Sequence, residues 1–328
     1  AAHYPQAQAM LLADAILDGG AQPIKAVFAI GMNVMMWPNS TRLAKALASL
    51  DTFVTADFFH TPTTELADLV LPAATSLERP ALIAPGDGRV RYRRVAVEPE
   101  GEARPDAQML IDLGCRLGMA DRFWHGDFEA SVRERLEGVP ELTLEQLVAA
   151  PAGITVPGDE VHPERAYETR GFKTPSGKIE FESDELRRHG YAALPVYEEP
   201  AESPVSTPGV ASEYPLVLTS GGRSRNFTHS QHRNVAWLRE LEPHARIQIH
   251  PDDAAARGIA DGDAVLVSSP RGATTFRAWV TDVVAPGVAH AFHGWVESNI
   301  NDLIDDATLD KISGFPPFKS SLCEVRKA

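Results

Sequence analysis

The chain has 328 residues, of which 44% are hydrophobic and 23% charged, the composition of an ordinary folded globular protein. A chain of this length normally exceeds one core, so we expect two compact units. Its 31 basic and 45 acidic residues give a formal net charge of −14, which argues against nucleic acid or an anionic membrane surface as the main partner. An anionic ligand would therefore have to be held by local donors.

The sequence shows no sign of a membrane span or a secretion signal. It has no run of about 18 apolar residues, and its beginning, AAHYPQAQAM, contains neither a basic nor an apolar signal region. The first residue is alanine, so we expect a processed product or a piece of a longer protein, and the compartment is left open. Cys115 and Cys323 lie in no C-x-x-C motif. Cys115 falls in an amphipathic helical pattern typical of a buried structural thiol.

Strands and helices alternate in the first part of the chain. Residues 25–31 form an apolar strand pattern, and residues 41–50 follow with helical periodicity. Residues 52–59 and 68–74 are the second and third strand patterns, with a short helical turn between them. This βαβαβ order predicts a parallel sheet.

The middle of the chain is less regular. We expect an arginine-rich strand at 88–99, a helix near 106–118 and further acidic, amphipathic helix within 127–150. Residues 151–200 are rich in proline and glycine and contain few long periodic segments. Residues 198–213, EEPAESPVSTPGVASE, are the best candidate for a linker.

Short strands dominate the last part of the chain. A short helix with a glycine turn, PDDAAARGIADGD, and a tight turn, PRGA, separate some of them. The pattern predicts a small β-barrel beginning at residue 214. The expected strands are residues 215–221, 245–250, 263–270, 274–281 and 287–295.

The turn after the first strand is a candidate ligand site. Gly31 and Asn33 lie between a strand and a helix, where ligands of open α/β sheets bind. Gly31 permits close approach to the backbone. The helix opened by Asn39 or Ser40 would direct free N–H groups towards an anion. The alternative interpretation is an ordinary strand-to-helix turn.

Two acidic residues later in the α/β part are further candidates. Asp57 ends the second strand and is followed by the hydroxyls of Thr61, Thr63 and Thr64, a setting in which a carboxylate accepts from a ribose or a base edge. Asp106 follows a proline at the start of a helix. Its local pattern favours a helix N-cap over a ligand contact.

Two histidine pairs suggest a metal site, but we predict none. His290 and His293 lie three residues apart in an expected strand, so they should point to opposite faces. His229 and His232 have the same spacing and no neighbouring cysteine or carboxylate to complete a site. The chain also lacks G-x-S-x-G, Walker A and H-E-x-x-H motifs, so a hydrolase interpretation is weak.

The stretch LTSGGRSRNFTHSQHRN has the highest density of hydrogen-bond donors. Thr219, Ser220, Gly221 and Gly222 end a strand pattern before a polar loop. Such a loop suits a polar, negatively charged ligand, whereas the alternative is a solvated cationic loop. The donors of this loop are Arg223, Arg225, His229, Ser230 and Gln231.

Several of these segments, in this order, resemble the C-terminal half of the molybdopterin oxidoreductases of the dimethyl sulfoxide reductase family. The resemblance covers nearly the whole chain. It implies a partial α/β cofactor domain at residues 1–197, the linker at 198–213 and a double-psi β-barrel at 214–328. The matching segments are residues 23–47, 51–78, 101–118, 171–183 and 214–328.

The resemblance also implies a cofactor. Members of this family bind two molybdopterin guanine dinucleotides around one molybdenum or tungsten ion. Residues 293–325 are most similar to the branch that contains thiosulfate, polysulfide and arsenate reductases and acetylene hydratase. The family's iron–sulfur cluster and its metal ligand belong to an N-terminal part that nothing in this sequence matches. We therefore predict no metal-ligating residue in this chain and leave its catalytic residues open.

The family's cofactor contacts can be transferred to matching positions. In the α/β domain the resemblance implies contacts to the dinucleotide, and it turns Asp106 into an acceptor for the N–H edge of guanine, since two donors can meet two carboxylate oxygens. Val34 stands where the family often has proline, which affects this turn. The implied cofactor contacts are Gly31, Asn33, Asp57, Thr61 and Asp106 in the α/β domain, Thr219, Gly221, Arg223, His229, Ser230 and Gln231 in the barrel loop, and Asn301, Phe318 and Lys319 near the C-terminus.

The resemblance predicts part of an oxidoreductase that transfers oxygen atoms or electron pairs, with this chain inactive alone. Its implied partners are the remaining N-terminal part of the catalytic subunit and an iron–sulfur electron-transfer subunit. Two alternatives stay open. One is a non-redox hydratase or transhydroxylase with the same cofactor, and the other is a cofactor-binding module without catalysis.

Overall fold

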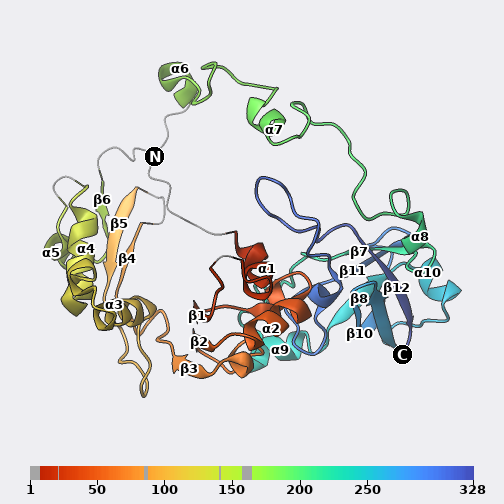
Figure 1. The fold of residues 1–328 in the computed structure, drawn as a ribbon, viewed down its shortest axis with the longest axis horizontal. Helices are drawn as coiled ribbons and strands as arrows, with labels where there is room; N and C mark the ends of the chain where they lie inside the picture. Colours follow the sequence, from red (N-terminus) through yellow and green to blue (C-terminus); the bar gives the residue numbers. More distant parts are fainter. Residues whose placement is uncertain (1–7, 21, 85–87, 140–141, 157–164) are drawn as a thin grey trace.

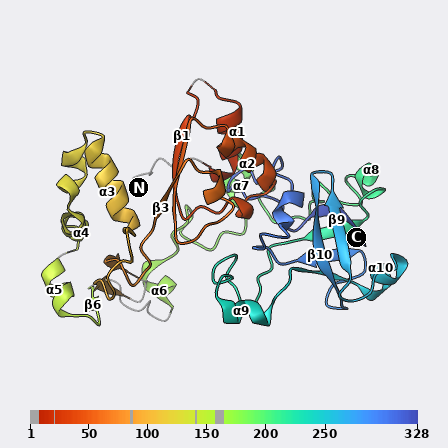
Figure 2. The ribbon, with the colours of Figure 1, turned by 90° about the horizontal axis from the view of Figure 1, so that it is seen from below.

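The computed structural model describes residues 8–20, 22–84, 88–139, 142–156 and 165–328. Figures 1 and 2 show three groups of elements in a row. A helical group with a small sheet lies at one end, a parallel sheet lies in the middle, and a closed β-barrel lies at the other end. Among the described residues, no helix is long and apolar enough to cross a membrane.

The middle group is the predicted parallel sheet. Its strand order is β1-β2-β3, and every pairing is parallel, which confirms the βαβαβ order. Alternation along β1 sends Val27 and Ala29 to one face and Phe28 and Ile30 to the other. The elements are η1 (Ala9–Leu11), α1 (Leu12–Leu17), β1 (Ala26–Ile30), η2 (Val34–Met36), α2 (Ser40–Ala48), β2 (Thr52–Asp57), η3 (Thr64–Leu66) and β3 (Leu69–Pro72).

Helices α1 and α2 cover one face of this sheet. Leu43 and Leu47 lie one turn apart on α2 and are almost completely buried together with Phe53 of β2 and Ile16 of α1. The burial of these side chains holds α2 against the sheet. It also fixes the turn between β1 and α2, where Gly31 and Asn33 lie.

The helical group contains the expected helix near 106–118 and a small antiparallel sheet, β4-β5-β6. The expected strand at 88–99 is shorter than predicted and ends at Arg93. The helical pattern within 127–150 corresponds to two helices, since Thr143 starts the second with a capping box. The elements are β4 (Ala81–Ile83), β5 (Arg89–Arg93), α3 (Asp106–Arg116), η4 (Ala120–Arg122), η5 (Trp124–Gly126), α4 (Phe128–Leu136), α5 (Leu144–Ala149) and β6 (Ile154–Thr155).

A long excursion connects this group to the barrel. Its described part, from residue 165 onward, contains two short helices, α6 (Ala166–Arg170) and α7 (Asp184–Arg188), at the top of Figure 1. The predicted linker, residues 198–213, contacts the barrel, because Glu202 is mostly buried and pairs with Arg271. The same carboxylate accepts a hydrogen bond from the Leu322 N–H at 2.6 Å.

The last group is a closed barrel of six strands in the order β10-β8-β11-β7-β12-β9, with parallel and antiparallel pairs. The predicted combination of a parallel α/β sheet with a barrel is thereby confirmed. Strand β12 was not among the expected strands, yet it pairs with both β7 and β9 and closes the barrel. The elements are α8 (Pro208–Ala211), β7 (Leu216–Thr219), α9 (Ala236–Leu241), β8 (Arg246–Ile249), α10 (Pro251–Ala256), β9 (Ala264–Ser269), β10 (Gly272–Val280), β11 (Val288–Ala291), η6 (Ile300–Leu303) and β12 (Ser321–Lys327).

Candidate functional site

The donor-rich loop at residues 220–234 begins against β11. At the end of β7 the Thr219 hydroxyl lies 2.8 Å from Nδ1 of His290. Gly222 packs so closely on the same imidazole that a Cβ there would lie 2.4 Å from its Nε2 atom. The Ser220 N–H donates to the Phe318 carbonyl at 2.7 Å. Neighbouring segments of the barrel therefore hold the start of the loop.

The far end of the loop rests on the residues that follow β11. Nδ1 of His229 lies 2.6 Å from Nε2 of His293. The backbones also touch, since a Cβ on Gly294 would lie 2.4 Å from the His229 carbonyl oxygen. Gly294 has φ +99° and His229 has φ 57°, a region that non-glycine residues rarely adopt. Tertiary contacts therefore enforce an unusual backbone at His229.

Trp295 packs under two residues of the loop, Phe227 and Arg233. Its side chain is 1% exposed, and the Phe227 ring packs edge-on against it at 5.8 Å between centroids. The Arg233 guanidinium lies 5.5 Å from the indole centroid and pairs with Glu297 at 3.3 Å. The loop is therefore a packed element, with Phe227 and Arg233 as its buried anchors.

The expectation that His290 and His293 lie on opposite faces of one strand is wrong. Strand β11 ends at Ala291, so the alternation does not extend to His293. Both imidazoles instead contact the donor-rich loop, at Thr219 and at His229. Among the residues that the structure describes, no group of three or more His, Cys, Asp or Glu side chains could hold a metal ion.

Burial disfavours the charged form of three imidazoles at this loop, those of His229, His290 and His293. Burial lowers the pKa of His293 to about 4, with further lowering by the neighbouring His229 and Arg223. Burial and then Arg223 also lower the pKa of His229. Burial lowers the pKa of His290 as well. Arg223 is therefore a positive charge that acts on both His229 and His293.

Arg223, like Arg225, is an unpaired cation of the loop within the described chain. It is exposed, and it makes no hydrogen bond or ion pair with any residue in the described ranges. Gly221, two residues earlier, has φ +88° and open space around its missing side chain. A ligand can therefore approach both the guanidinium and the backbone beside it.

The donor-rich loop meets the α/β part at a single pair of predicted site residues. The Asn33 amide donates to the Ser230 hydroxyl at 2.6 Å, although the two are far apart in sequence. The other amide atom of Asn33 accepts from the Met35 N–H at 3.1 Å. Next to it, the Val34 N–H donates to the buried hydroxyl of Thr63 at 2.9 Å. The structure therefore brings Asn33 and Ser230 together.

Asn301 joins the same two parts of the molecule from η6. It is 1% exposed, and its amide donates to the Met35 carbonyl at 2.6 Å. The backbone carbonyl of Asn301 accepts from the Asn39 N–H at 2.8 Å. The Oδ1 atom of Asn301 is buried without a hydrogen-bond partner among the described residues. Asn301 is thus a buried joint between the barrel and the turn before α2.

From the sequence we expected the start of α2 to face a ligand. In the structure it contacts the barrel instead. The Ser40 hydroxyl donates to the Asp302 carboxylate at 2.5 Å, and the Asn299 amide donates to the Ser40 hydroxyl. Asn39, at φ 44°, donates from its amide to Asp306 at 3.0 Å. Two carboxylates of the barrel therefore lie beside the first residues of α2 and bond their side chains.

Three predicted residues lie at the carboxyl edge of the parallel sheet. Gly31 has φ +59° with open space around it, and its N–H donates to the Ala56 carbonyl at 3.0 Å. Asp57 follows Ala56 directly and is the last residue of β2. One of its carboxylate oxygens accepts from the Phe58 N–H at 2.7 Å. The Thr61 hydroxyl accepts from the Thr64 N–H at 3.3 Å. Gly31 and Asp57 thus end neighbouring strands, as predicted.

Asp106 is not the N-cap of α3. Pro105 holds that position, and Asp106 lies in the first turn. Its carboxylate pairs with Arg79 at 2.8 Å, and both side chains are partly buried. The structure shows no contact between Asp106 and another predicted site residue. It lies near β3, because the Arg104 N–H donates to the Pro72 carbonyl.

The remaining predicted residues surround the donor-rich loop. Gln231 is exposed and joins Thr228 through backbone hydrogen bonds. Phe318 accepts from Ser220 and packs its ring against Phe315 at 5.5 Å between centroids. Lys319 follows Phe318 directly. Sequence reasoning missed His290, His293, Gly294 and Trp295 as supports of the loop, although the sequence AHAFHGW attracted attention for its histidines.

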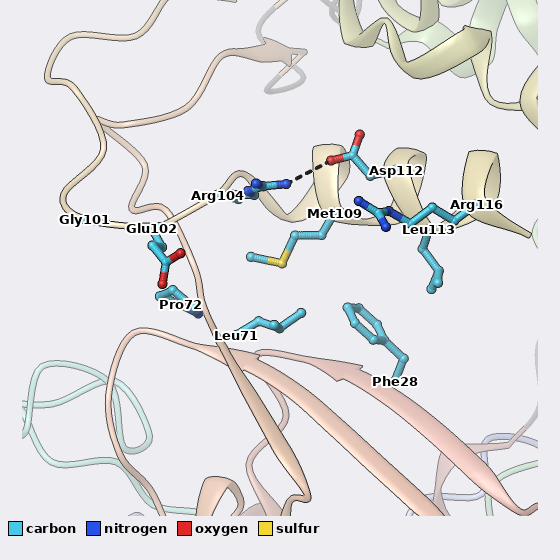
Figure 3. Close-up of a pocket in the computed structure, with 11 residues that line it drawn as sticks. Phe28, Leu71, Pro72, Gly101, Glu102, Arg104, Met109, Asp112, Leu113 and Arg116 are labelled. Carbon is cyan, nitrogen blue, oxygen red and sulfur yellow. Dashed lines mark hydrogen bonds and ion pairs between the residues drawn. The ribbon is translucent and has the colours of Figure 1, made fainter.

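A pocket of the described chain lies elsewhere. It has a volume of about 550 Å³ and lies between the sheet and α3, and no predicted site residue lines it. Figure 3 shows Phe28 and Leu71 on the sheet side and Met109 on the helix side, with the Arg104–Asp112 pair at 3.4 Å. Its lining mixes apolar side chains with Arg104, Arg116, Glu102 and Asp112, and it contains none of the predicted cofactor contacts.

Comparison with known proteins gives two family matches. The sequence profile described as molybdopterin oxidoreductase matches residues 9–116, and the profile described as molydopterin dinucleotide binding domain matches residues 216–322. The first match contains the parallel sheet, and the second contains nearly the whole barrel.

Individual relatives match most of this chain but less than half of their own length. A protein of Halobacterium salinarum, named as a putative catalytic subunit of dimethyl sulfoxide reductase, is 35% identical over 95% of this chain and 39% of its own. Acetylene hydratase of Syntrophotalea acetylenica is 32% identical over 76% of this chain and 34% of its own. The solved structure of acetylene hydratase from Pelobacter acetylenicus superposes with a TM-score of 0.81 at 27% identity, covering 98% of this chain and 47% of that one.

Proposed function

Because the chain belongs to the molybdopterin oxidoreductases of the dimethyl sulfoxide reductase family, we propose that it is the cofactor-binding, carboxyl-terminal portion of a catalytic subunit. The catalytic subunit would transfer oxygen atoms or electron pairs. The observation that carries this proposal is the anchored loop at residues 220–234, which presents the unpaired Arg223 beside open backbone at Gly221.

The residues of this loop fit a molybdopterin guanine dinucleotide. Such a ligand offers phosphate oxygens and a polar pterin ring, which match a guanidinium, an imidazole and free backbone groups. The buried, unpartnered Oδ1 of Asn301 leaves one further acceptor near the joint with the α/β part. In this proposal the pterin and phosphate contacts come from Thr219, Gly221, Arg223, His229, Ser230, Gln231, Asn301, Phe318 and Lys319.

The sheet edge would hold the dinucleotide end. Gly31 leaves space for close approach, and one oxygen of Asp57 has no hydrogen bond within the described chain. Asn33 and Thr61 would act beside them. Asp106 would accept from guanine with the carboxylate oxygen that Arg79 does not hold. The complete subunit would bind two dinucleotides. One would contact the residues of the barrel, and the other would contact the residues at the edge of the sheet.

When bound, the cofactor supplies molybdenum or tungsten and its two-electron chemistry. The residues of this chain bind and orient it, and the ligand of the metal and the iron–sulfur cluster would lie in the remaining part of the subunit. The chain alone would lack turnover. An iron–sulfur electron-transfer subunit is the further partner we propose, in keeping with relatives that are named as subunits.

One alternative has specific support. Two of the relatives are named acetylene hydratase, so the same cofactor site could serve a non-redox hydration. The discriminating residues would lie in the part of the subunit that this chain does not include. A module that binds no cofactor is the outcome that would contradict both versions.

The test is the cofactor content of the complete catalytic subunit. Arg223→Ala and Asp106→Ala should each reduce metal and pterin content by about ten-fold or more at limiting cofactor, because each removes a charge-assisted contact of about 1.5–3 kcal/mol. Metal analysis and pterin fluorescence measure both contents.

Matched controls remove a charge elsewhere. Arg326→Ala acts on an exposed residue of β12, and Asp121→Ala acts on a carboxylate that is 94% exposed. Both should keep full cofactor content. Unchanged metal and pterin in Arg223→Ala and Asp106→Ala would contradict the assignment of these sites.

A further inference from the structure

We propose that His293 is a positioning residue that holds the imidazole of His229 with its outward nitrogen as a hydrogen-bond donor to the ligand. This inference rests on the proposed cofactor site for the identity of the ligand. The orientation of His229 itself can be tested without any cofactor.

The ring contact sets the orientation of His229. Its Nδ1 atom lies 2.6 Å from Nε2 of His293, so that side of the ring is already engaged. Only the Nε2 atom of His229 is left to meet a ligand. His293 is 8% exposed and can therefore hold one fixed orientation, which a solvated side chain could not.

The backbone reinforces this contact. His229 adopts φ 57°, and the Gly294 backbone fits against its carbonyl, where a Cβ would come within 2.4 Å. The residue after His293 therefore holds the backbone of the same histidine that His293 holds by its ring. Two adjacent residues thus act on one residue of the loop.

When both rings are neutral, they can share one proton in only two ways. If His229 donates from Nδ1, its outward Nε2 is an acceptor. If His293 donates from Nε2, the outward Nε2 of His229 carries a proton and becomes a donor. Arg223 is exposed, has no ion-pair partner in the described chain and lies close enough to His229 to lower its pKa, so the ligand it attracts is rich in negative oxygens. A donor at His229 suits such a ligand, which selects the second arrangement.

The first measurement concerns the 328-residue chain without cofactor. Carbon and nitrogen NMR shifts of the histidine rings at pH 7 report the tautomer, and the loss of one signal set in His229→Gln identifies His229. We expect the tautomer with the proton on Nε2. A proton on Nδ1 of His229 would overturn the proposal.

Two variants then separate the hydrogen bond from packing. His293→Leu removes the donor but keeps an apolar side chain, and His229 should then show a mixture of tautomers. His293→Gln places an amide near the position of the lost Nε2 and should restore the Nε2–H tautomer. An unchanged tautomer in His293→Leu would contradict the proposal, and thermal unfolding confirms that each variant is folded.

The same variants in the complete subunit connect the positioning to binding. His293→Leu should lower pterin content about five-fold at limiting cofactor, the effect of one net hydrogen bond, and His293→Gln should recover most of it. A tautomer change with full pterin content would support the positioning of His229 and would overturn its assignment to the cofactor. The two failures are therefore distinguishable.

Discussion

The barrel encloses its own core, whereas the α/β part leaves much of its apolar surface uncovered. In the barrel, Leu218, Ile247 and Trp295 are at most 1% exposed. In the α/β part, Phe58 and Leu117 are 54% and 65% exposed. A barrel closes on itself and needs no neighbour to cover an edge. A parallel sheet of three strands has two edges and two faces to cover.

The two faces of the parallel sheet differ in the same way. Helices α1 and α2 bury one face around Leu43 and Phe53. On the other face Phe28 and Leu71 pack against Met109 of α3, and a pocket of about 550 Å³ opens between the sheet and this helix. The chain spans less than half the length of the relatives it matches. We infer that the barrel is stabilised by closing on its own core. The sheet region depends on further protein to cover its exposed apolar side chains.

The strongest test of this contrast is a cavity in the barrel. Trp295→Ala should lower the free energy of unfolding by about 3–5 kcal/mol, because it removes a buried indole together with the support of Phe227 and Arg233. Trp237→Ala is the matched control, since that side chain is 65% exposed on α9. Denaturant unfolding measures both, and equal losses would break the comparison.

A smaller effect should follow from acid. The native pKa of His293 is about 4 against an ordinary value of 6.5, so between these pH values only the unfolded chain binds the proton at His293. The free energy of unfolding should therefore fall as pH drops from about 6.5 to 4, by at most about 1.4 kcal/mol per pH unit for this group. Below pH 4 this contribution should cease to change.

The His293→Gln variant should flatten that dependence. His244→Gln, at an exposed histidine outside the donor-rich loop, should keep it. Unfolding curves at pH 4, 5, 6 and 7 measure the slopes. The same slope in His293→Gln and wild type would show that another group causes the acid sensitivity.

The smallest effect is expected in the α/β part. Leu117→Ala at the end of α3 should change the free energy of unfolding of the 328-residue chain by less than about 0.5 kcal/mol, because the side chain is already in contact with water. Leu218→Ala in the barrel should cost about 2–5 kcal/mol. A large loss at Leu117 would show that this region is better packed than its exposure indicates.

Local sequence patterns predicted most of the elements of the fold. Alternation and strand-to-helix order predicted β1 to β3 and their parallel pairing, because residue periodicity reflects which face of an element is buried. The same reasoning missed β12, whose residues SLCEVRK gain their pairing only from the distant β7 and β9. It also extended β11 beyond Ala291, where the chain leaves the strand.

By itself the sequence determined the types of the elements, the donor-rich loop after β7 and the positions of Gly31 and Asp57 at the ends of strands. These follow from neighbouring residues along the chain. Only the tertiary structure decided the partners: His293 for His229, Ser230 for Asn33, and Arg79 for Asp106. Such pairs lie 27 to 197 residues apart, and no local periodicity records which distant side chains the packing of the core will bring together.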